Sequence, residues 1–263
     1  MDSRRKSKIH VRIIALIIVI CLILVGVGFA VYYFVKPSSV SNPAITSSPI
    51  KEDKHINIYF VRHGKTDANI NNVFCGRGTD AKLIDEGRET TKKTGMTLRD
   101  IKFDKVFTSE LSRTLDTANI ILEENNNGLI RLEPINLLND IDWGDIEGKT
   151  DAEVSKEYPN YTFEQFIGTP GDTNFVSPIH ASTENQMVNQ FYEALKEICK
   201  GTPDGGNVLV VGHSSFVWLL DVLFPEQMKG IDGLNNSSIT LIEYNKGKMS
   251  LKQVNVDADK FNV

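Results

Sequence analysis

The chain has 263 residues, of which 41% are hydrophobic and 24% charged. A chain of this length and composition can bury one sizeable hydrophobic core. The net charge is −5, but the first 36 residues carry +5, so the remainder carries −10. An acidic remainder argues against non-specific nucleic-acid binding. We therefore expect no nucleic-acid partner, and a local basic pocket for any anionic ligand.

The N-terminal segment has the pattern of a membrane anchor. Residues 13–35 form an uncharged, apolar run of 23 residues, which is long enough to cross a bilayer as a helix. The run ends in Tyr32-Tyr33-Phe34, as is typical of a membrane interface, and five basic residues precede it. The sequence predicts a cytoplasmic tail over 1–12, a single-pass transmembrane helix over 13–35 and an extracellular domain beyond it. A buried core helix is the less favoured alternative.

A Ser/Pro-rich segment follows the apolar run. Its composition predicts a flexible linker over 36–53 and a folded domain over 54–263. Outside the apolar run there are two cysteines, Cys75 and Cys199. They could form a disulfide in an oxidising compartment. A single possible pair is not the set of several disulfides that is typical of disulfide-stabilised domains, so we expect both cysteines to be free.

Strand and helix patterns alternate along the domain. Short apolar runs that favour strands fall at 56–61, 105–108, 130–135 and 207–212. Helical patterns fall at 85–98, 111–122, 183–200 and 214–224, with Thr183 as the N-cap of the third. Residues 238–244 and 249–254 alternate like a hairpin. The order predicts an α/β fold, a three-layer sandwich with a mainly parallel sheet and the hairpin at one edge.

Three of the predicted strands end in side chains suited to phosphate. Arg62-His63-Gly64 follows the first strand, Arg113 lies just after the second, and His213 follows the strand at 207–212. Because the carboxyl ends of parallel strands meet at one edge of a sheet, we expect these side chains to converge there. The loop Leu138-Asn139-Asp140 would add a carboxylate.

These residue types match the needs of phosphoryl transfer. The reaction requires neutralisation of the equatorial oxygens, an in-line nucleophile and an acid for the leaving oxygen. Arginine binds phosphate oxygens bidentately, a neutral imidazole is nucleophilic, and a carboxylic acid can protonate the leaving group. The cations remove the need for a metal, and no Cys/His spacing indicates a metal site, so we expect no metal and no cofactor.

These motifs resemble those of the histidine phosphatase superfamily, the phosphoglycerate-mutase-like enzymes, over about Ile56 to Val254. The resemblance implies that His63 accepts the phosphoryl group and that Asp140 donates the proton. It also implies a set of phosphate-binding residues: Arg62, Asn69, Gly76, Arg113 and His213. Where the family usually has Glu as the donor, this chain has Asp140, and three nearby carboxylates stay open as alternatives: Asp142, Asp145 and Glu147.

The resemblance implies a phosphatase that hydrolyses small phosphomonoesters through a phosphohistidine on His63. The alternatives are a phosphoglycerate-mutase-type phosphotransferase and an inactive binding module of the same fold. The family's Gly-Glu-Ser block has no clean match here, and Glu184 is the nearest candidate. We expect the substrate to be set by residues 148–183, where the aromatic cluster of Tyr161, Phe163 and Phe166 favours packing over ligand contact.

Overall fold

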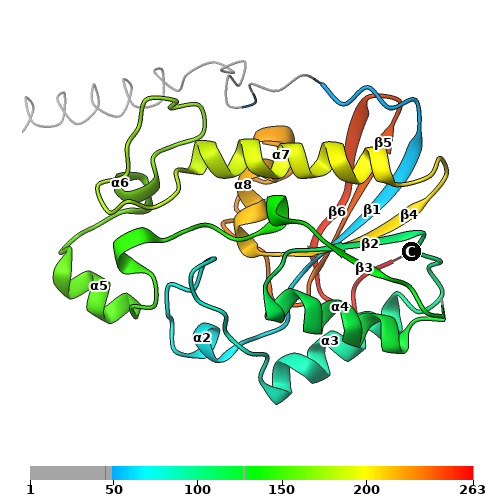
Figure 1. Ribbon diagram of the computed structural model, residues 1–263, viewed down its shortest axis with the longest axis horizontal. Coiled ribbons are helices and arrows are strands. Elements are labelled where there is room, and N and C mark those ends of the chain that lie inside the picture. Colours follow the sequence, from blue (N-terminus) through cyan, green and yellow to red (C-terminus); the bar gives the residue numbers. More distant parts are fainter. Residues whose placement is uncertain (1–44, 46–48, 127, 263) are drawn as a thin grey trace, which may run out of the picture. The chain divides into compact units, whose positions relative to one another are not determined.

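The computed structural model of the chain describes residues 45, 49–126 and 128–262 (Figure 1). The predicted cytoplasmic tail and transmembrane helix, and most of the predicted linker, lie outside the described residues. Within the described ranges, no helix is both long and apolar enough to cross a membrane.

The described domain is built on one six-stranded sheet with the order β3-β2-β4-β1-β5-β6. The strands are β1 (His55–Arg62), β2 (Lys105–Thr108), β3 (Leu132–Pro134), β4 (Asn207–Gly212), β5 (Ile239–Asn245) and β6 (Lys248–Val256). The neighbouring pairs among β3, β2, β4 and β1 are parallel, whereas β5 is antiparallel to both β1 and β6. The α/β fold and the hairpin at the sheet edge are therefore confirmed, and the sheet is mixed but mostly parallel.

Helices cover both faces of this sheet, as Figure 1 shows. Central β4 is buried at five of its six positions. Its residues Val208 and Val210 join a core under α7 (Glu184–Gly201) and α8 (Val217–Leu223), while Leu209 and Val211 join a second core under α4 (Ser112–Glu124). Helix α3 (Asp85–Thr97) packs beside α4. An apolar strand covered on both faces is what the continuous hydrophobic run at 207–212 predicted.

Thr183 caps α7 as the sequence predicted. The Thr183 Oγ1 atom accepts a hydrogen bond from Gln186 N at 3.1 Å, and Thr183 N donates to Gln186 Oε1 at 2.8 Å. This reciprocal capping box satisfies two free N–H groups of the first turn. The buried face of α7 is apolar, as expected for an amphipathic helix, and includes Met187, Val188, Phe191, Leu195 and Ile198.

Several short helices differ from the sequence prediction. The helix expected over 214–224 begins as the 3-10 turn η3 (Ser214–Phe216), and the strand expected over 130–135 has only three residues. Short helices α2 (Asp67–Ile70) and α6 (Phe163–Ile167) were not predicted, and a third short helix is α5 (Asp151–Glu157). The helices α2, α5 and α6 each begin with a capping box, in which local side-chain hydrogen bonds stabilise the first turn. Helices this short do not need a repeating pattern of apolar residues. Two further 3-10 turns are η1 (Asn136–Leu138) and η2 (Gly144–Ile146).

The end of the predicted linker lies against the domain. Ile50 is buried in the core under α7, and Ile45 packs against the same core. The hydroxyl of Tyr244 in β5 donates to Glu52 O at 2.7 Å. The chain therefore contacts the domain before residue 54.

Candidate active site

The three strand ends come together at one edge of the sheet. Arg62 ends β1, Arg113 lies in the first turn of α4 after β2, and His213 follows β4. Strands β2, β4 and β1 are neighbours, which explains why their ends meet. The ring centroids of His63 and His213 are 5.3 Å apart. The predicted convergence of these four side chains is observed.

Backbone contacts fix the orientation and tautomer of His63. Its N–H donates to Gly212 O at 2.9 Å, and its Nδ1 lies 2.8 Å from Gly64 O. Because a carbonyl only accepts hydrogen bonds, Nδ1 carries the proton and Nε2 keeps the lone pair. A Cβ on Gly64 would lie 2.6 Å from Thr91 Oγ1, so the turn after His63 requires glycine.

Both histidines are held in the neutral form. Burial lowers the pKa of His63 well below 6.5, and the positive charge of Arg62 lowers it further. Burial and the charge of Arg113 act in the same way on the pKa of His213. A neutral imidazole with a fixed Nδ1–H is the form that can act as a nucleophile through Nε2.

The guanidinium of Arg62 is partly buried at the cavity, and its hydrogen bonds are incomplete. Its Nη1 donates to Leu234 O, but its Nε is buried without a hydrogen-bond partner among the described residues. Burial lowers the pKa of Arg62 to about 10; the nearby charge of Asp140 opposes this effect and that of Arg113 adds to it. A cation at a cavity with a buried, unpartnered N–H group is a candidate site for an anion.

Arg113 lies beneath the loop that follows β1 and is 1% exposed. Its Nη1 donates to Thr79 O at 3.0 Å, and its Nη2 donates to Gly76 O at 3.0 Å and Asp140 Oδ2 at 3.2 Å. The loop carbonyls therefore hold its guanidinium in place.

Gly76, predicted to bind phosphate, has both backbone groups paired with protein atoms. Its C=O accepts from Arg113, and its N–H donates to Glu147 Oε1 at 2.7 Å. A Cβ at this position would come within 1.9 Å of Ile141 O. Gly76 thus allows the loop to approach closely enough to hold Arg113.

Asp140 is the one carboxylate of the four candidates that lines the cavity. Glu147 accepts from the backbone of Gly76 and Trp143, Asp142 accepts from Gly144 N, and Asp145 pairs with the exposed ring of His180. The geometry therefore favours Asp140 over its neighbours as the group that could meet a leaving oxygen.

Donors approach both oxygens of Asp140. Oδ1 accepts from Ser215 Oγ at 2.5 Å and from Ile141 N at 3.0 Å. Oδ2 lies 3.2 Å from Arg113 Nη2 and 3.3 Å from His213 Nδ1. This last pair is within ion-pair distance but lacks hydrogen-bond alignment, and His213 Nδ1 has no other partner in the described ranges.

Ser109 fixes the other side of the His213 ring. Its Oγ lies 2.9 Å from His213 Nε2 and 2.7 Å from Thr114 Oγ1. Ser109 directly follows β2, and Thr114 lies in the first turn of α4. The second histidine is therefore held between one serine and one carboxylate.

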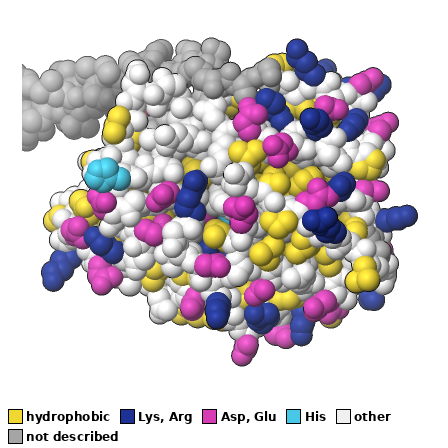
Figure 2. Space-filling view, in the orientation of Figure 1, with side chains coloured by type: hydrophobic (Ala, Val, Ile, Leu, Met, Phe, Trp, Pro, Cys, Tyr) yellow, Lys and Arg dark blue, Asp and Glu magenta, His cyan; other side chains and the backbone are white. Residues whose placement is uncertain are grey.

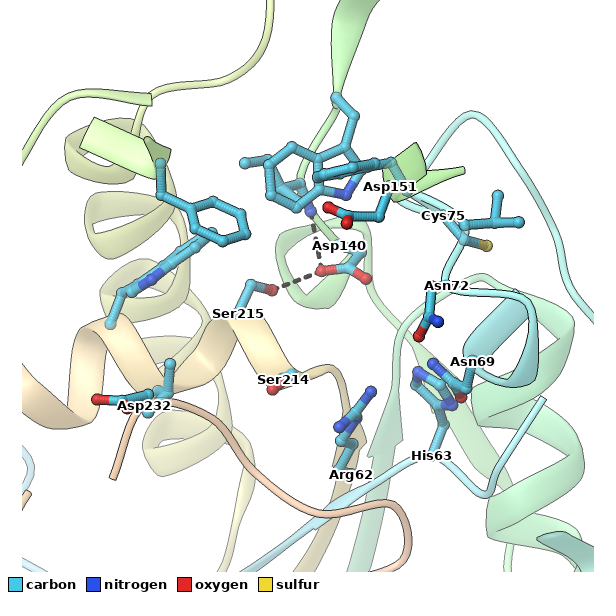
Figure 3. A pocket seen from close by; sticks show the side chains of 17 residues that line it. Arg62, His63, Asn69, Asn72, Cys75, Asp140, Asp151, Ser214, Ser215 and Asp232 are labelled. Atoms are coloured by element: carbon cyan, nitrogen blue, oxygen red, sulfur yellow. Dashed lines mark hydrogen bonds between the residues drawn. The ribbon is translucent and has the colours of Figure 1, made fainter. Parts of the chain in front are cut away.

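A cavity of about 600 Å³ opens above these residues. Figure 3 shows Arg62 and His63 extending into it, with the hydrogen bond between Ser215 and Asp140 on another part of its wall. Asn69 also lines it, whereas Gly76, Arg113 and His213 lie behind the lining. On the face shown in Figure 2, acidic and basic side chains are interspersed and form no broad basic patch.

Asn69 is held by its carbonyl oxygen. Asn69 Oδ1 accepts from Thr66 N at 3.0 Å and from Asn236 Nδ2 at 3.2 Å. Asn236 Nδ2 also donates to His63 O at 3.0 Å. Because Oδ1 is engaged, the amide nitrogen of Asn69 is the group that an anion in the cavity would contact.

The sequence prediction missed three residues that support the site: Ser109, Ser215 and Asn236. Ser215 and Ser109 adjoin predicted motifs, so their hydroxyls could have been considered. Asn236 carried no signal, because its contact depends on the segment after α8 folding back to β1.

Cys75 and Cys199 are both free, as expected. Among the described residues there is no group of three or more His, Cys, Asp or Glu side chains that could hold a metal ion.

Comparison with known proteins identifies the family. The model of the histidine phosphatase superfamily (branch 1) matches residues 58–257. A 2,3-bisphosphoglycerate-dependent phosphoglycerate mutase of Cytophaga hutchinsonii is 31% identical over 203 residues, which cover 75% of this chain and 91% of that protein.

Two solved structures show the shared fold. Phosphoglycerate mutase from Bacillus anthracis superposes with a TM-score of 0.64 at 24% identity, covering 79% of this chain and 96% of that one. A mycobacterial glucosyl-3-phosphoglycerate phosphatase superposes with a TM-score of 0.65 at 20% identity, covering 77% and 100%.

Fold and site together define an α/β domain with paired arginines and histidines at the carboxyl edge of its sheet. The chain belongs to the histidine phosphatase superfamily, branch 1. Its similar proteins carry the names of both mutases and phosphatases.

Proposed function

We propose that this chain is a phosphatase that hydrolyses phosphomonoesters through a phosphohistidine on His63. The observation that carries the proposal is the buried, unpartnered Nε of Arg62 beside a neutral His63 whose Nδ1 is already bonded to Gly64 O. The free Nε–H of Arg62 can bind an anionic oxygen of a phosphate group. The bond of Nδ1 to Gly64 O leaves the lone pair on His63 Nε2, which can attack the phosphorus.

In the first half-reaction, the lone pair of His63 Nε2 forms a bond to phosphorus in line with the leaving oxygen. The bond between phosphorus and that oxygen breaks, and its electron pair stays on the oxygen, which takes a proton from Asp140 in its acid form. Arg62 offsets the charge of the other oxygens from the cavity lining, with Asn69 as a further candidate contact. Arg113 adds positive charge from behind the lining, where Gly76 holds it and where the neutral His213 also lies.

In the second half-reaction, water attacks the phosphorus of the phosphohistidine. The Asp140 carboxylate takes a proton from that water, and the electron pair of the nitrogen–phosphorus bond returns to His63 Nε2. Inorganic phosphate then leaves, and His63 is again neutral.

The mutase alternative has the support of the named relatives. A mutase would return the phosphoryl group to a hydroxyl of a substrate that carries a carboxylate. The residues that line the cavity argue against such a substrate, since only Arg62 and His63 are basic, while Asp140, Asp151 and Asp232 are acidic. A second anionic group would lie among carboxylates. The inactive binding module is opposed by the geometry of His63 and Arg62.

We also propose that the domain faces the outside of the cell, anchored by the helix predicted over 13–35. The support is the sequence pattern of an uncharged span behind five basic residues. Protease added to intact cells should remove the domain, and a domain that survives while it is degraded in lysed cells would contradict the export.

The activity is tested with the full chain in detergent. Phosphate release is followed from a panel of phosphomonoesters, with His63→Ala in parallel. We expect release by the natural chain and none by the variant. Absence of release over the whole panel would contradict hydrolysis, and transfer of the phosphoryl group to a second phosphoglycerate hydroxyl without release would favour the mutase.

A further inference from the structure

Part of the cavity lining is aromatic. We define the aromatic wall as Phe74, Trp143, Phe163 and Trp218, which all line the cavity. The chain contains only two tryptophans, and both belong to this wall. Trp218 comes from α8 and Phe163 from the first position of α6, so segments far apart in the sequence supply it.

Three of these rings pack against one another. The centroids of Phe74 and Trp143 are 5.1 Å apart with the rings at 80°, and those of Trp143 and Phe163 are 5.9 Å apart. Phe74 is buried, but Phe163 is 53% exposed although it touches the other two. The capping box of Thr162 and Gln165 holds the first turn of α6 that carries Phe163. An exposed ring fixed at a cavity wall offers its surface to a ligand.

The charges along the cavity separate into two regions. Figure 3 shows Arg62 and His63 together, with Asp151 and Asp232 well away from them and from each other. Both aspartates are exposed. An anionic group next to either of them would be repelled, whereas an uncharged or cationic group would not. The aromatic wall therefore favours an apolar group in the part of the ligand beyond its phosphate. The two aspartates favour substituents on that part that are uncharged or cationic.

The contacts of Asp140 point to the same class of ligand. Its two oxygens already accept hydrogen bonds from three donors, on Ser215, Ile141 and Arg113. Donating a proton would require this carboxyl group to give up at least one of these contacts. An aryl oxide leaves with little help from an acid, since phenols ionise near pH 10, about the value for tyrosine.

We propose that the natural substrates are aryl phosphomonoesters whose ring contacts the aromatic wall and whose ring substituents are uncharged or cationic. This proposal rests on the proposed hydrolysis. The bond between phosphorus and the aryl oxygen breaks, the phosphoryl group passes to His63 Nε2, and the oxygen keeps its bond to the ring.

Binding is tested without turnover. In the full chain with His63→Ala, the fluorescence of Trp143 and Trp218 reports on occupancy of the cavity, because the chain has no other tryptophan. We expect phenyl phosphate to saturate the signal at a concentration about 10-fold lower than glycerol phosphate does, and Phe163→Ala to remove most of that preference. Equal affinity for the two esters would overturn the proposal, and so would a preference unchanged by Phe163→Ala.

A second test compares the turnover of the two esters. Phe163→Ala in the otherwise natural chain should lower the ratio of kcat/KM for phenyl phosphate to that for glycerol phosphate by about 5-fold, mainly through KM. Met96→Ala is the matched control, since Met96 is 51% exposed on α3 and lies outside the cavity. A ratio that falls equally in both variants would contradict the proposal.

A separate pair of variants tests the effect of the two aspartates in the cavity lining. The double variant Asp151→Asn with Asp232→Asn should raise kcat/KM for phosphoglycerate about 5-fold relative to phenyl phosphate, whereas Asp259→Asn, outside the cavity, should leave the ratio unchanged. No change in the double variant would contradict the charge argument. If no ester is hydrolysed at all, the proposed hydrolysis fails, while the fluorescence titration still decides on the aromatic wall.

Discussion

Ser215 Oγ donates a hydrogen bond of 2.5 Å to Asp140 Oδ1, joining two residues that lie 75 positions apart in the chain. Ser215 belongs to the turn η3 after β4, and Asp140 follows η1. The bond therefore ties the candidate acid to the segment that carries His213. It sets the direction in which Asp140 presents its carboxyl group to the cavity.

Ser215→Ala should lower kcat by about 10-fold and reduce the free energy of unfolding by about 1–2 kcal/mol, because a buried carboxylate loses one donor. The measurements are phosphate release and urea unfolding. Ser238→Ala is the matched control, since Ser238 is also buried and its Oγ has no hydrogen-bond partner in the described ranges. Equal losses in both variants would contradict the positioning role of Ser215.

Asp140→Asn should affect substrates according to their leaving groups. We expect kcat for glycerol phosphate to fall by about 100-fold or more, and kcat for an aryl phosphate to fall much less, because an aryl oxide needs less proton donation. A plot of log kcat against the pKa of the leaving alcohol or phenol should become steeper in the variant. The same fractional loss for all leaving groups would indicate that Asp140 is not the acid.

Gly76→Ala should destabilise the domain by about 3 kcal/mol or more, since its Cβ would meet Ile141 O at 1.9 Å and the loop that holds Arg113 would have to move. Thermal or urea unfolding measures this loss. Gly201→Ala, at the end of α7, is the control, because its nearest neighbour is the side chain of Phe107 at 3.2 Å. A Gly76→Ala variant as stable as the natural chain would contradict the close approach.

Stability should fall as the pH drops below 6.5. The folded domain keeps the pKa of His63 and His213 well below 6.5 because both rings are buried beside arginines, whereas in the unfolded chain they titrate near that value. Below pH 6.5 the unfolded chain therefore binds protons that the folded domain does not, and the free energy of unfolding decreases; above it the contribution is fully present.

Urea unfolding at about pH 8 and about pH 5 measures this difference. His213→Gln should reduce the change with pH, because one of the two titrating groups is removed. A natural chain equally stable at the two pH values would contradict the buried neutral histidines.

The part of the site that the sequence predicted is local to each strand end. Each of these side chains lies at or shortly after the end of an apolar run: Arg62-His63-Gly64, Arg113 and His213. A parallel sheet is enough to bring them together. Their convergence therefore followed from the order of strands and helices. The resemblance pointed to Asp140 but left Asp142, Asp145 and Glu147 open, because the carboxylate that faces the cavity is decided by contacts of the folded chain.

The features that the sequence did not predict depend on contacts between distant segments. Asn236 reaches His63 O only because the segment after α8 returns to β1. Phe163 and Phe166, three positions apart in α6, have opposite environments: Phe166 is buried against Tyr161, and Phe163 lies at the cavity. The expected packing role was therefore right for Phe166, whereas a periodic pattern in a five-residue helix could not distinguish the two.

The central claim is that His63 carries the phosphoryl group between two displacements at phosphorus. The most direct measurement is the stereochemical course of hydrolysis, with phenyl phosphorothioate made chiral by 16O and 18O, hydrolysed in 17O-labelled water by the full chain in detergent, so that the thiophosphate released is itself chiral. Each in-line displacement inverts the phosphorus, so two displacements predict overall retention of configuration. Overall inversion would mean that water attacks the ester directly, and it would contradict the phosphohistidine.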